Sequence, residues 1–447
     1  MATDAQGLTI TAASDAAAAG YDHVVSGYLR YRADAGQRLK ALLDLDGEMP
    51  MGHVLKGAFA MLAYNAGQVP RATEAAATAA RLAGTARESA HAAALALWAE
   101  GEMDRALGAW EAIMATHPHD VLAFRLHHFC AFWLGRAGQM LRAVDAVGPH
   151  WSAAIPGYGS ILACRCFANE ECGNYQVAEE AGRAAVALDP ADLWATHGVA
   201  HILEMQGRRG EGIAWLKALE PHWDGGSNLL HHLWWHRAMY HLERGEHDEV
   251  LSLYDRGFRN QASALTQAMP DLYIDVQNAA SMLFRLQRHG VDVGDRWLEI
   301  ADKAEARIGD CLSTFTLPHW MMALAATGRT QAAARMLDAM RDAATRPGTI
   351  APILREAAIP VCEAVLAHAQ GDHGRAVEAM RPTLGVMHRM GGSHAQQDVL
   401  EQLFLDAAMK AGAEEDARML LERVAGRHPV RPERRVGYAE AARRVGH

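Results

Sequence analysis

The chain has 447 residues, of which 50% are hydrophobic and only 7% aromatic, and its 43 basic and 53 acidic side chains give a formal charge of −10. Abundant alanine with few aromatics favours packed helices over strands, and the length allows a long repeat array. The acidic excess argues against nucleic acid as a partner, and no window approaches 18 uninterrupted apolar residues, so we expect no membrane span.

In chain order, we expect a helical cap over residues 1–43, a repeat superhelix over 44–430 and a capping segment over 431–447. The repeat is clearest in the copy that follows a turn at Gly101. Its packing residues stand at offsets 0, +4, +7 and +12, at Ala106, Trp110, Ile113 and Pro118. This is the pattern of the second helix, and of the proline that stops it, in a 34-residue tetratricopeptide (TPR) hairpin.

Further copies of this pattern run along the chain at spacings of 34 to 45 residues. The small packing residue of the second helix recurs at Ala72, Ala106, Ala143, Ala178, Gly212, Val250, about Asp295, Ala333, Ala376 and Ala417. The turns between helices are expected at Gly67, Gly101, Gly138, Gly173, Gly207, Gly245, Gly290, Gly328, Gly371 and Gly412. One hairpin cannot bury its own apolar face, whereas stacked hairpins can. We therefore predict an all-α fold, a right-handed α-solenoid of about ten TPR-like hairpins.

Short sequence motifs predict one loop and one helix N-cap, and the absence of other motifs argues against some classes of enzyme. Pro149–Gly159 is expected as a loop, and Ser393 as the N-cap of a helix. The chain has no glycine-rich phosphate loop and no nucleophile elbow, which argues against the common NTPases and hydrolases. The six cysteines form no C-x-x-C pair, and residues 1–20 lack the pattern of a secretory signal. We therefore expect a cytoplasmic protein.

Histidine is frequent, with 24 residues, and its placement is informative. His197, His201 and Glu204 are spaced i, i+4 and i+7, which puts them on one face of a helix. His232 and His236 form a second i, i+4 pair in the next hairpin. Since the first helix of such hairpins lines a concave surface, the two groups are expected to converge in a groove.

Three interpretations of this cluster stay open. The imidazoles can be packed core groups. The four histidines can be ligands of a divalent metal such as zinc, iron or manganese, for which the spacing is suitable. The cluster can also serve as acid and base, with Glu204 orienting a histidine. Other candidates for contact with a ligand are His91, His128, Trp235, Tyr240, Asp275 and His319.

The chain resembles the tetratricopeptide repeat protein 38 family from about Tyr21 to about Ala442. The matching stretches are MGH (51–53), HPHDVLAF (117–124), WATHGVAHILEM (194–205), HHLWWHRAMYHLERGE (231–246), SMLFRLQRHGVDVGDRW (281–297) and GGSHAQQDV (391–399). The family pattern carries onto His197, Val199, Ala200, His201, Glu204, Met205, His232, Trp235, His236, Ala238 and Tyr240. The chain departs at His394, where an asparagine is common. The resemblance implies a helical-repeat fold and no particular activity.

The leading hypothesis from the sequence is a soluble protein that binds a small molecule or short peptide in a histidine-rich groove. An enzyme that uses the same side chains as acid, base or metal ligands is the alternative. A scaffold for another protein is the second alternative. A homo-oligomer is compatible with each of them.

Overall fold

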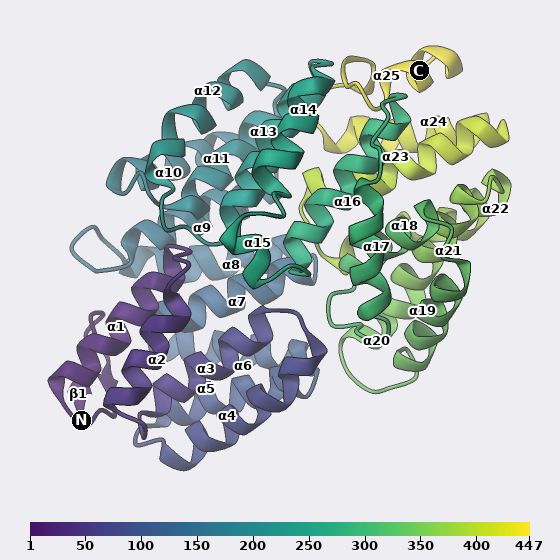
Figure 1. The fold of residues 1–447 in the computed structure, drawn as a ribbon. Helices are drawn as coiled ribbons and strands as arrows, with labels where there is room; N and C mark the ends of the chain where they lie inside the picture. The colour runs from purple at the N-terminus through teal and green to yellow at the C-terminus, as the bar shows by residue number, and fades with distance from the viewer. The chain divides into compact units, whose positions relative to one another are not determined.

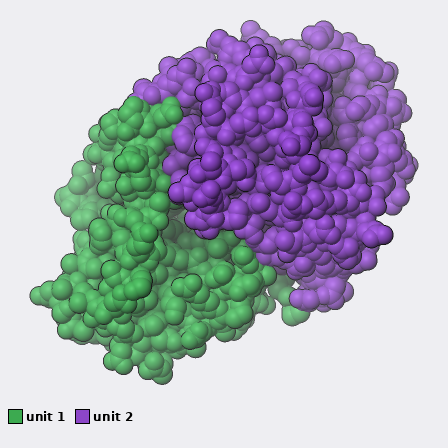
Figure 2. Space-filling view, in the orientation of Figure 1, with its two compact units in different colours: residues 1–199, 219–229, 347–349 green, residues 200–218, 230–346, 350–447 purple.

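A computed structural model describes residues 1–447. The fold is all-α apart from a two-stranded hairpin, β1 (Ala2–Thr3) with β2 (Thr9–Ile10), and Figure 1 shows the helices in chain order. None of the helices combines the length and the apolar character needed to cross a bilayer. The chain forms two compact units, coloured separately in Figure 2. Unit 1 comprises residues 1–199, 219–229 and 347–349, and unit 2 comprises residues 200–218, 230–346 and 350–447.

Unit 1 begins with the strands and continues as successive helical hairpins. Its helices are α1 (Asp15–Leu29), α2 (Ala35–Leu45), α3 (Pro50–Leu62), α4 (Val69–Leu82), α5 (Ala86–Ala99), α6 (Met103–Thr116), α7 (Val121–Trp133), α8 (Ala137–Val147), α9 (Tyr158–Glu171), α10 (Tyr175–Leu188) and the start of α11 (Leu193–Met205). Each helix from α3 to α9 packs on the helix before and after it in the chain. The N-terminal strands were not predicted. The loop expected at Pro149–Gly159 is confirmed over residues 151–157, whereas its two ends lie in the short 3-10 turn Gly148–His150 and in α9.

Unit 2 continues the same hairpin pattern to the end of the chain. Its helices are the end of α11, α12 (Arg209–Leu219), α13 (Leu229–Leu242), α14 (His247–Leu253), α15 (Ala264–Ala268), α16 (Tyr273–Arg288), α17 (Arg296–Ala306), α18 (Thr316–Ala326), α19 (Thr330–Ala343), α20 (Ile350–Ile353), α21 (Ile359–Ala369), α22 (His373–Met380), α23 (His394–Ala411), α24 (Glu414–Arg427) and α25 (Ala439–Val445). The π-helical turns η4 (Tyr254–Phe258) and η5 (Leu354–Ala358) extend α14 and α20. The predicted all-α hairpin architecture is confirmed.

The predicted packing residues explain why the hairpins close. Ala106, Ala178, Ala333 and Ala417 lie in the second helices of their hairpins and are fully buried. A side chain this small lets the two helices of a hairpin approach closely, so neighbouring apolar faces bury one another. Ser393 caps α23 as expected, because its hydroxyl accepts a hydrogen bond from the Gln396 backbone N–H at 3.3 Å.

Two details of the predicted register are wrong. The turn after α7 uses Gly135, with φ of 65°, whereas Gly138 lies inside α8. A left-handed backbone conformation favours glycine, and Gly135 lies eight residues before Ala143, whereas the pattern places the turn five residues before the packing residue. Asp295 precedes α17 instead of lying within it, because α15 and its flanking turns add residues to this repeat.

Within unit 2 the last hairpin returns to earlier helices, and α23 lies beside α16 (Figure 1). Arg285 of α16 donates to Asp398 Oδ2 of α23 at 3.3 Å. The C-terminal residues Arg435 and Tyr438 both donate to Asp398 Oδ1, at 2.6 Å each. The burial of these charges is therefore compensated inside one polar network that fastens the C-terminal segment.

None of the six cysteines forms a disulfide, and all but Cys172 are buried. Cys130, Cys164 and Cys166 are buried in unit 1, and Cys311 and Cys362 are buried in unit 2. Burial raises the pKa of the Cys130, Cys166 and Cys362 thiols well above the ordinary value. These thiols are therefore protonated core groups at neutral pH.

Candidate functional site

Three histidines of unit 2 converge in its interior. Helix α11 supplies His201, and α13 supplies His232 and His236 from successive turns of one face. The ring centroid of His236 lies 4.4 Å from that of His201 and 4.7 Å from that of His232, and the other pair is 6.4 Å apart. Their possible ligating atoms lie within 4.8 Å of one another, and each residue exposes 2% of its surface or less. The predicted meeting of imidazoles from two hairpins is therefore present in this unit.

Hydrogen bonds from neighbouring helices fix the orientation of two of these rings. His232 Nδ1 lies 2.7 Å from Asn278 Oδ1, which is on α16, and an amide oxygen can only accept. His236 Nδ1 lies 2.7 Å from Glu204 Oε2 on α11. Trp235 also holds the His232 ring, since the two are stacked with centroids 5.0 Å apart and planes 9° apart. For His232 the amide oxygen requires Nδ1 to donate, so the lone pair of this imidazole is on Nε2. In His236 the same nitrogen, Nδ1, is engaged with Glu204, and Nε2 faces away from that bond.

Burial controls the charge of the three rings. It lowers the pKa of His236 to about 3, and it lowers the pKa of His201 and His232 well below the ordinary value. Burial likewise raises the pKa of Glu204, to about 8. The cluster therefore holds neutral imidazoles at neutral pH, and neutral imidazole is the form that binds a metal ion.

The spacing of α11, α12 and α13 depends on one aromatic side chain. Tyr240 of α13 donates its hydroxyl hydrogen bond to the Ala200 carbonyl of α11 at 2.6 Å, and it is 1% exposed. Its ring fills the space next to Gly212 of α12, where an added Cβ would lie 2.3 Å from Tyr240 Cζ. The absence of a side chain at Gly212 therefore lets α12 and α13 approach.

Glu204 also borders a small cavity of about 30 Å³. Its walls come from α11, α12, α13, the start of α23 and the C-terminal segment, and its polar lining residues are Glu204, Arg209, Tyr240, Glu243, His428 and Arg435. This volume is suited to a single water-sized group. The cavity is too small for a peptide.

His197 lies one helical turn before His201 on α11, and it belongs to unit 1. Its ring stacks on Trp194, with centroids 4.7 Å apart, and lies 5.4 Å from Phe167. A role for His197 as a ligand stays a prediction that rests on its i, i+4 spacing with His201.

The other predicted contact residues have identifiable neighbours of their own. In unit 1, His91 Nε2 donates to Asp120 Oδ2 at 2.8 Å, and the His128 ring is buried 6.0 Å from Phe124. In unit 2, His319 Nδ1 donates to the Phe315 carbonyl at 2.8 Å, and Asp275 Oδ2 accepts from His231 Nδ1 at 3.0 Å. Trp235 donates from Nε1 to Ser281 Oγ at 3.2 Å. Binding of a ligand by His91, His128, Trp235, Tyr240, Asp275 and His319 stays a prediction.

Sequence reasoning missed the partner of His232. Asn278 follows Asp275 by three residues, so it lies on the same face of α16 as a residue that had been singled out. The residues between α13 and α16 include an additional helix, which displaced the expected register at this point. A helical-face plot of α16 by itself would have found Asn278.

No protein-family model matches the chain. Among solved structures, it is similar to the crystal structure of the P58(IPK) TPR domain at 2.5 Å, with 11% sequence identity over 89% of this chain and 97% of that chain. The TM-score is 0.20, which means that the two backbones do not superimpose as a whole.

Proposed function

We propose that this helical-repeat protein binds a divalent transition-metal ion through His201, His232 and His236. The observation that carries the proposal is the convergence of three buried imidazoles whose possible ligating atoms lie within 4.8 Å of one another. Hydrogen bonds to Asn278 and Glu204 hold two of the rings by Nδ1, so that Nε2 is the ligating atom. An orienting carboxylate or amide behind a histidine ligand is the usual arrangement in metal sites.

The chemistry of the cluster also selects the kind of ion. Imidazole ligands suit zinc, iron, copper and nickel, whereas magnesium and calcium prefer oxygen. Three histidines leave a fourth position of a tetrahedral ion for another ligand. We name zinc first, because it is bound by neutral imidazoles without redox chemistry, and iron as its competitor. Manganese, which the sequence also suggested, prefers oxygen ligands.

The size of the cavity next to the cluster favours a bound ion over a bound peptide. A peptide has no room next to Glu204, where the cavity is about 30 Å³. Membership of the tetratricopeptide repeat protein 38 family, a cytoplasmic location and a scaffold role for the hairpins are compatible with a bound ion, and each is a separate proposal.

The test is a metal titration of the purified full chain. After treatment with a chelator, we expect the chain to take up about one zinc or cobalt ion, and bound cobalt to show the visible absorption of a tetrahedral site. His236→Gln should weaken binding at least tenfold, which is about 1.4 kcal/mol. His222→Ala is the matched control, because His222 is an exposed histidine.

Circular dichroism of each variant separates loss of the ligand from loss of the fold. The proposal is wrong if the helical wild-type chain takes up no ion. It is also wrong if His236→Gln binds cobalt with the affinity of His222→Ala.

A further inference from the structure

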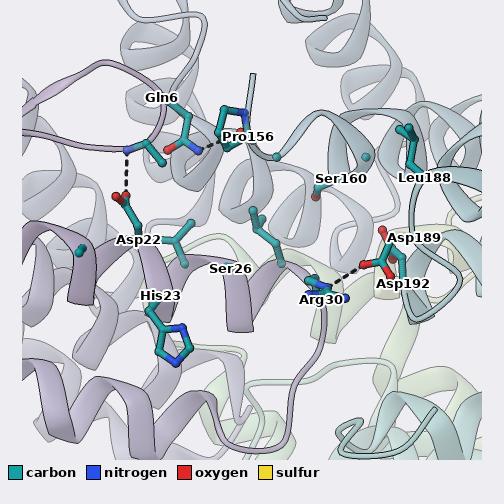
Figure 3. A pocket seen from close by; sticks show the side chains of 16 residues that line it. Gln6, Asp22, His23, Ser26, Arg30, Pro156, Ser160, Leu188, Asp189 and Asp192 are labelled. Atoms are coloured by element: carbon teal, nitrogen blue, oxygen red, sulfur yellow. Dashed lines mark hydrogen bonds and ion pairs between the residues drawn. The ribbon is translucent and has the colours of Figure 1, made fainter. Parts of the chain in front are cut away.

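Unit 1 contains a second and larger cavity, of about 500 Å³. Figure 3 shows its walls, which come from the turn between β1 and β2, from α1, from the loop before α9 with the start of that helix, and from the link between α10 and α11. A cavity of this volume lies within the range of small-molecule sites, about 300 to 1,000 Å³. None of the candidate site residues that the sequence suggested lines this cavity.

Contacts between distant parts of the sequence hold these walls together. Gln6 Nε2 donates to the Pro156 carbonyl at 2.9 Å, which joins the N-terminal turn to the loop before α9. The Ala5 backbone N–H donates to Asp22 Oδ1 at 2.9 Å, which joins the same turn to α1. On the opposite side, Arg30 pairs with Asp189 at 2.7 Å (Figure 3). These contacts therefore tie the walls of the cavity to one another.

The lining combines hydrocarbon with an excess of negative charge. Ala19, Val25, Leu29 and Leu188 supply apolar surface, and Leu188 is 56% exposed. The charged lining residues are Asp22, Arg30, Asp189 and Asp192. Because Arg30 is paired with Asp189, the charges of the other two carboxylates are left for a ligand.

Asp192 is the residue that distinguishes this cavity from a chance group of surface acids. It exposes only 5% of its surface, although it lines the cavity. Its Oδ1 accepts from the backbone N–H groups of Trp194 and Ala195, at 2.9 and 3.0 Å, and so caps α11. Oδ2 has no hydrogen bond or ion pair within the chain, so one oxygen of this buried lining carboxylate has no partner.

The environment of Asp192 explains why a positive ligand would be held there. Burial raises the pKa of Asp192 to about 6, which shows that its negative charge is poorly compensated. A cation next to Oδ2 would supply the missing compensation, and a carboxylate with an N–H donor of a cation forms a charge-assisted hydrogen bond. An anion would be repelled by the same group.

We propose that this cavity binds a small organic cation, an alkylammonium or alkylguanidinium compound. Its charged group lies against Asp192 and Asp22, and its hydrocarbon lies against Val25 and Leu29. This site is separate from the histidine cluster and does not depend on a metal ion.

The test compares three probes of one length at pH 7.5: n-hexylamine, n-hexanol and hexanoate. Isothermal titration calorimetry on the full chain should show binding of hexylamine at least tenfold tighter than hexanol, and no binding of hexanoate. Equal affinity for hexylamine and hexanol would overturn the proposal, because the charge would then play no part. A capped lysine tripeptide tests the alternative source of an ammonium group, and binding as tight as that of hexylamine would overturn the assignment to a small molecule.

Asp192→Asn supplies the matched variant. Asparagine caps a helix as well as aspartate does, so the fold is expected to remain while the charge is lost. The variant should bind hexylamine at least tenfold more weakly, and Asp145→Asn, at an exposed position of α8, should bind as the wild type does. If Asp192→Asn keeps wild-type affinity, the proposal is wrong.

Discussion

Replacing Gly212 by alanine should disturb both the packing and the histidine cluster of unit 2. An added Cβ would lie 2.3, 2.5 and 2.7 Å from three carbons of the Tyr240 ring, all much shorter than van der Waals contact. Tyr240 is 1% exposed, and the cavity that it lines, of about 30 Å³, has room for a water-sized group but not for a displaced ring. The ring must move, and the hydrogen bond from Tyr240 to the Ala200 carbonyl is then lost.

The size of the effect follows from three contributions. Overpacking costs about 1–3 kcal/mol, and a buried polar group left without its partner costs about 1–3 kcal/mol. Alanine is a better helix former than glycine by about 1 kcal/mol, which offsets part of this. We expect the free energy of unfolding to fall by about 3 kcal/mol, with a range of about 1 to 5 kcal/mol.

The control is Gly210→Ala, two residues earlier in the same helix, where nothing lies within 4 Å of an added Cβ. That change should raise stability by up to about 1 kcal/mol, through helix propensity. Urea unfolding followed by circular dichroism measures both variants. Because Tyr240 links α11 to α13, the Gly212 variant should also bind cobalt more weakly than the Gly210 variant. Equal stability of the two variants would refute the packing argument.

Three further changes test other contacts by urea unfolding. Asp120→Ala should cost about 3–5 kcal/mol, because it removes the acceptor of two buried donors, Arg87 Nη1 and His91 Nε2, each at 2.8 Å; a cost under 1 kcal/mol would contradict this. Burial lowers the pKa of His128, so folding favours its neutral form, and the resulting stability is present above pH 6.5 and falls as the pH falls below it. Between pH 7.5 and 5.5 the free energy of unfolding of the wild type should therefore fall by about 1.4 kcal/mol more than that of His128→Leu. Parallel pH profiles of the two proteins would contradict this. Tyr438→Phe should cost about 1–3 kcal/mol through its lost hydrogen bond to Asp398, and an unchanged midpoint would show that bond to be dispensable.

The periodic spacing of small residues was sufficient to predict the hairpins. Ala106 and Ala417 are buried where the pattern placed them, because the closest approach of two helices admits only a small side chain. The fixed five-residue offset of the pattern led to Gly138, whereas the chain turns at Gly135, because the backbone conformation of a glycine is not visible in the spacing. The N-terminal strands have two residues each, which is too short for any periodicity to show.

The histidine cluster could be predicted from the sequence in part, whereas the cavity at Asp192 could not. His201, His232 and His236 were found because helical spacing is local, and the register of neighbouring hairpins aligned them. Asn278 was missed because the added helix α15 changed the register before α16. The cavity at Asp192 was missed entirely, because its walls come from four segments that are joined only by tertiary contacts.

The buried cysteines allow the rate of local unfolding to be measured at several places in the chain. A thiol reagent can reach Cys130, Cys164 or Cys362 only after the surrounding helices separate, since each exposes 1% of its surface or less. The half-exposed Cys172 would react first and serve as the internal reference. Mass spectrometry of the labelled peptides over time would then rank the hairpins by their rates of local unfolding, without any engineered probe.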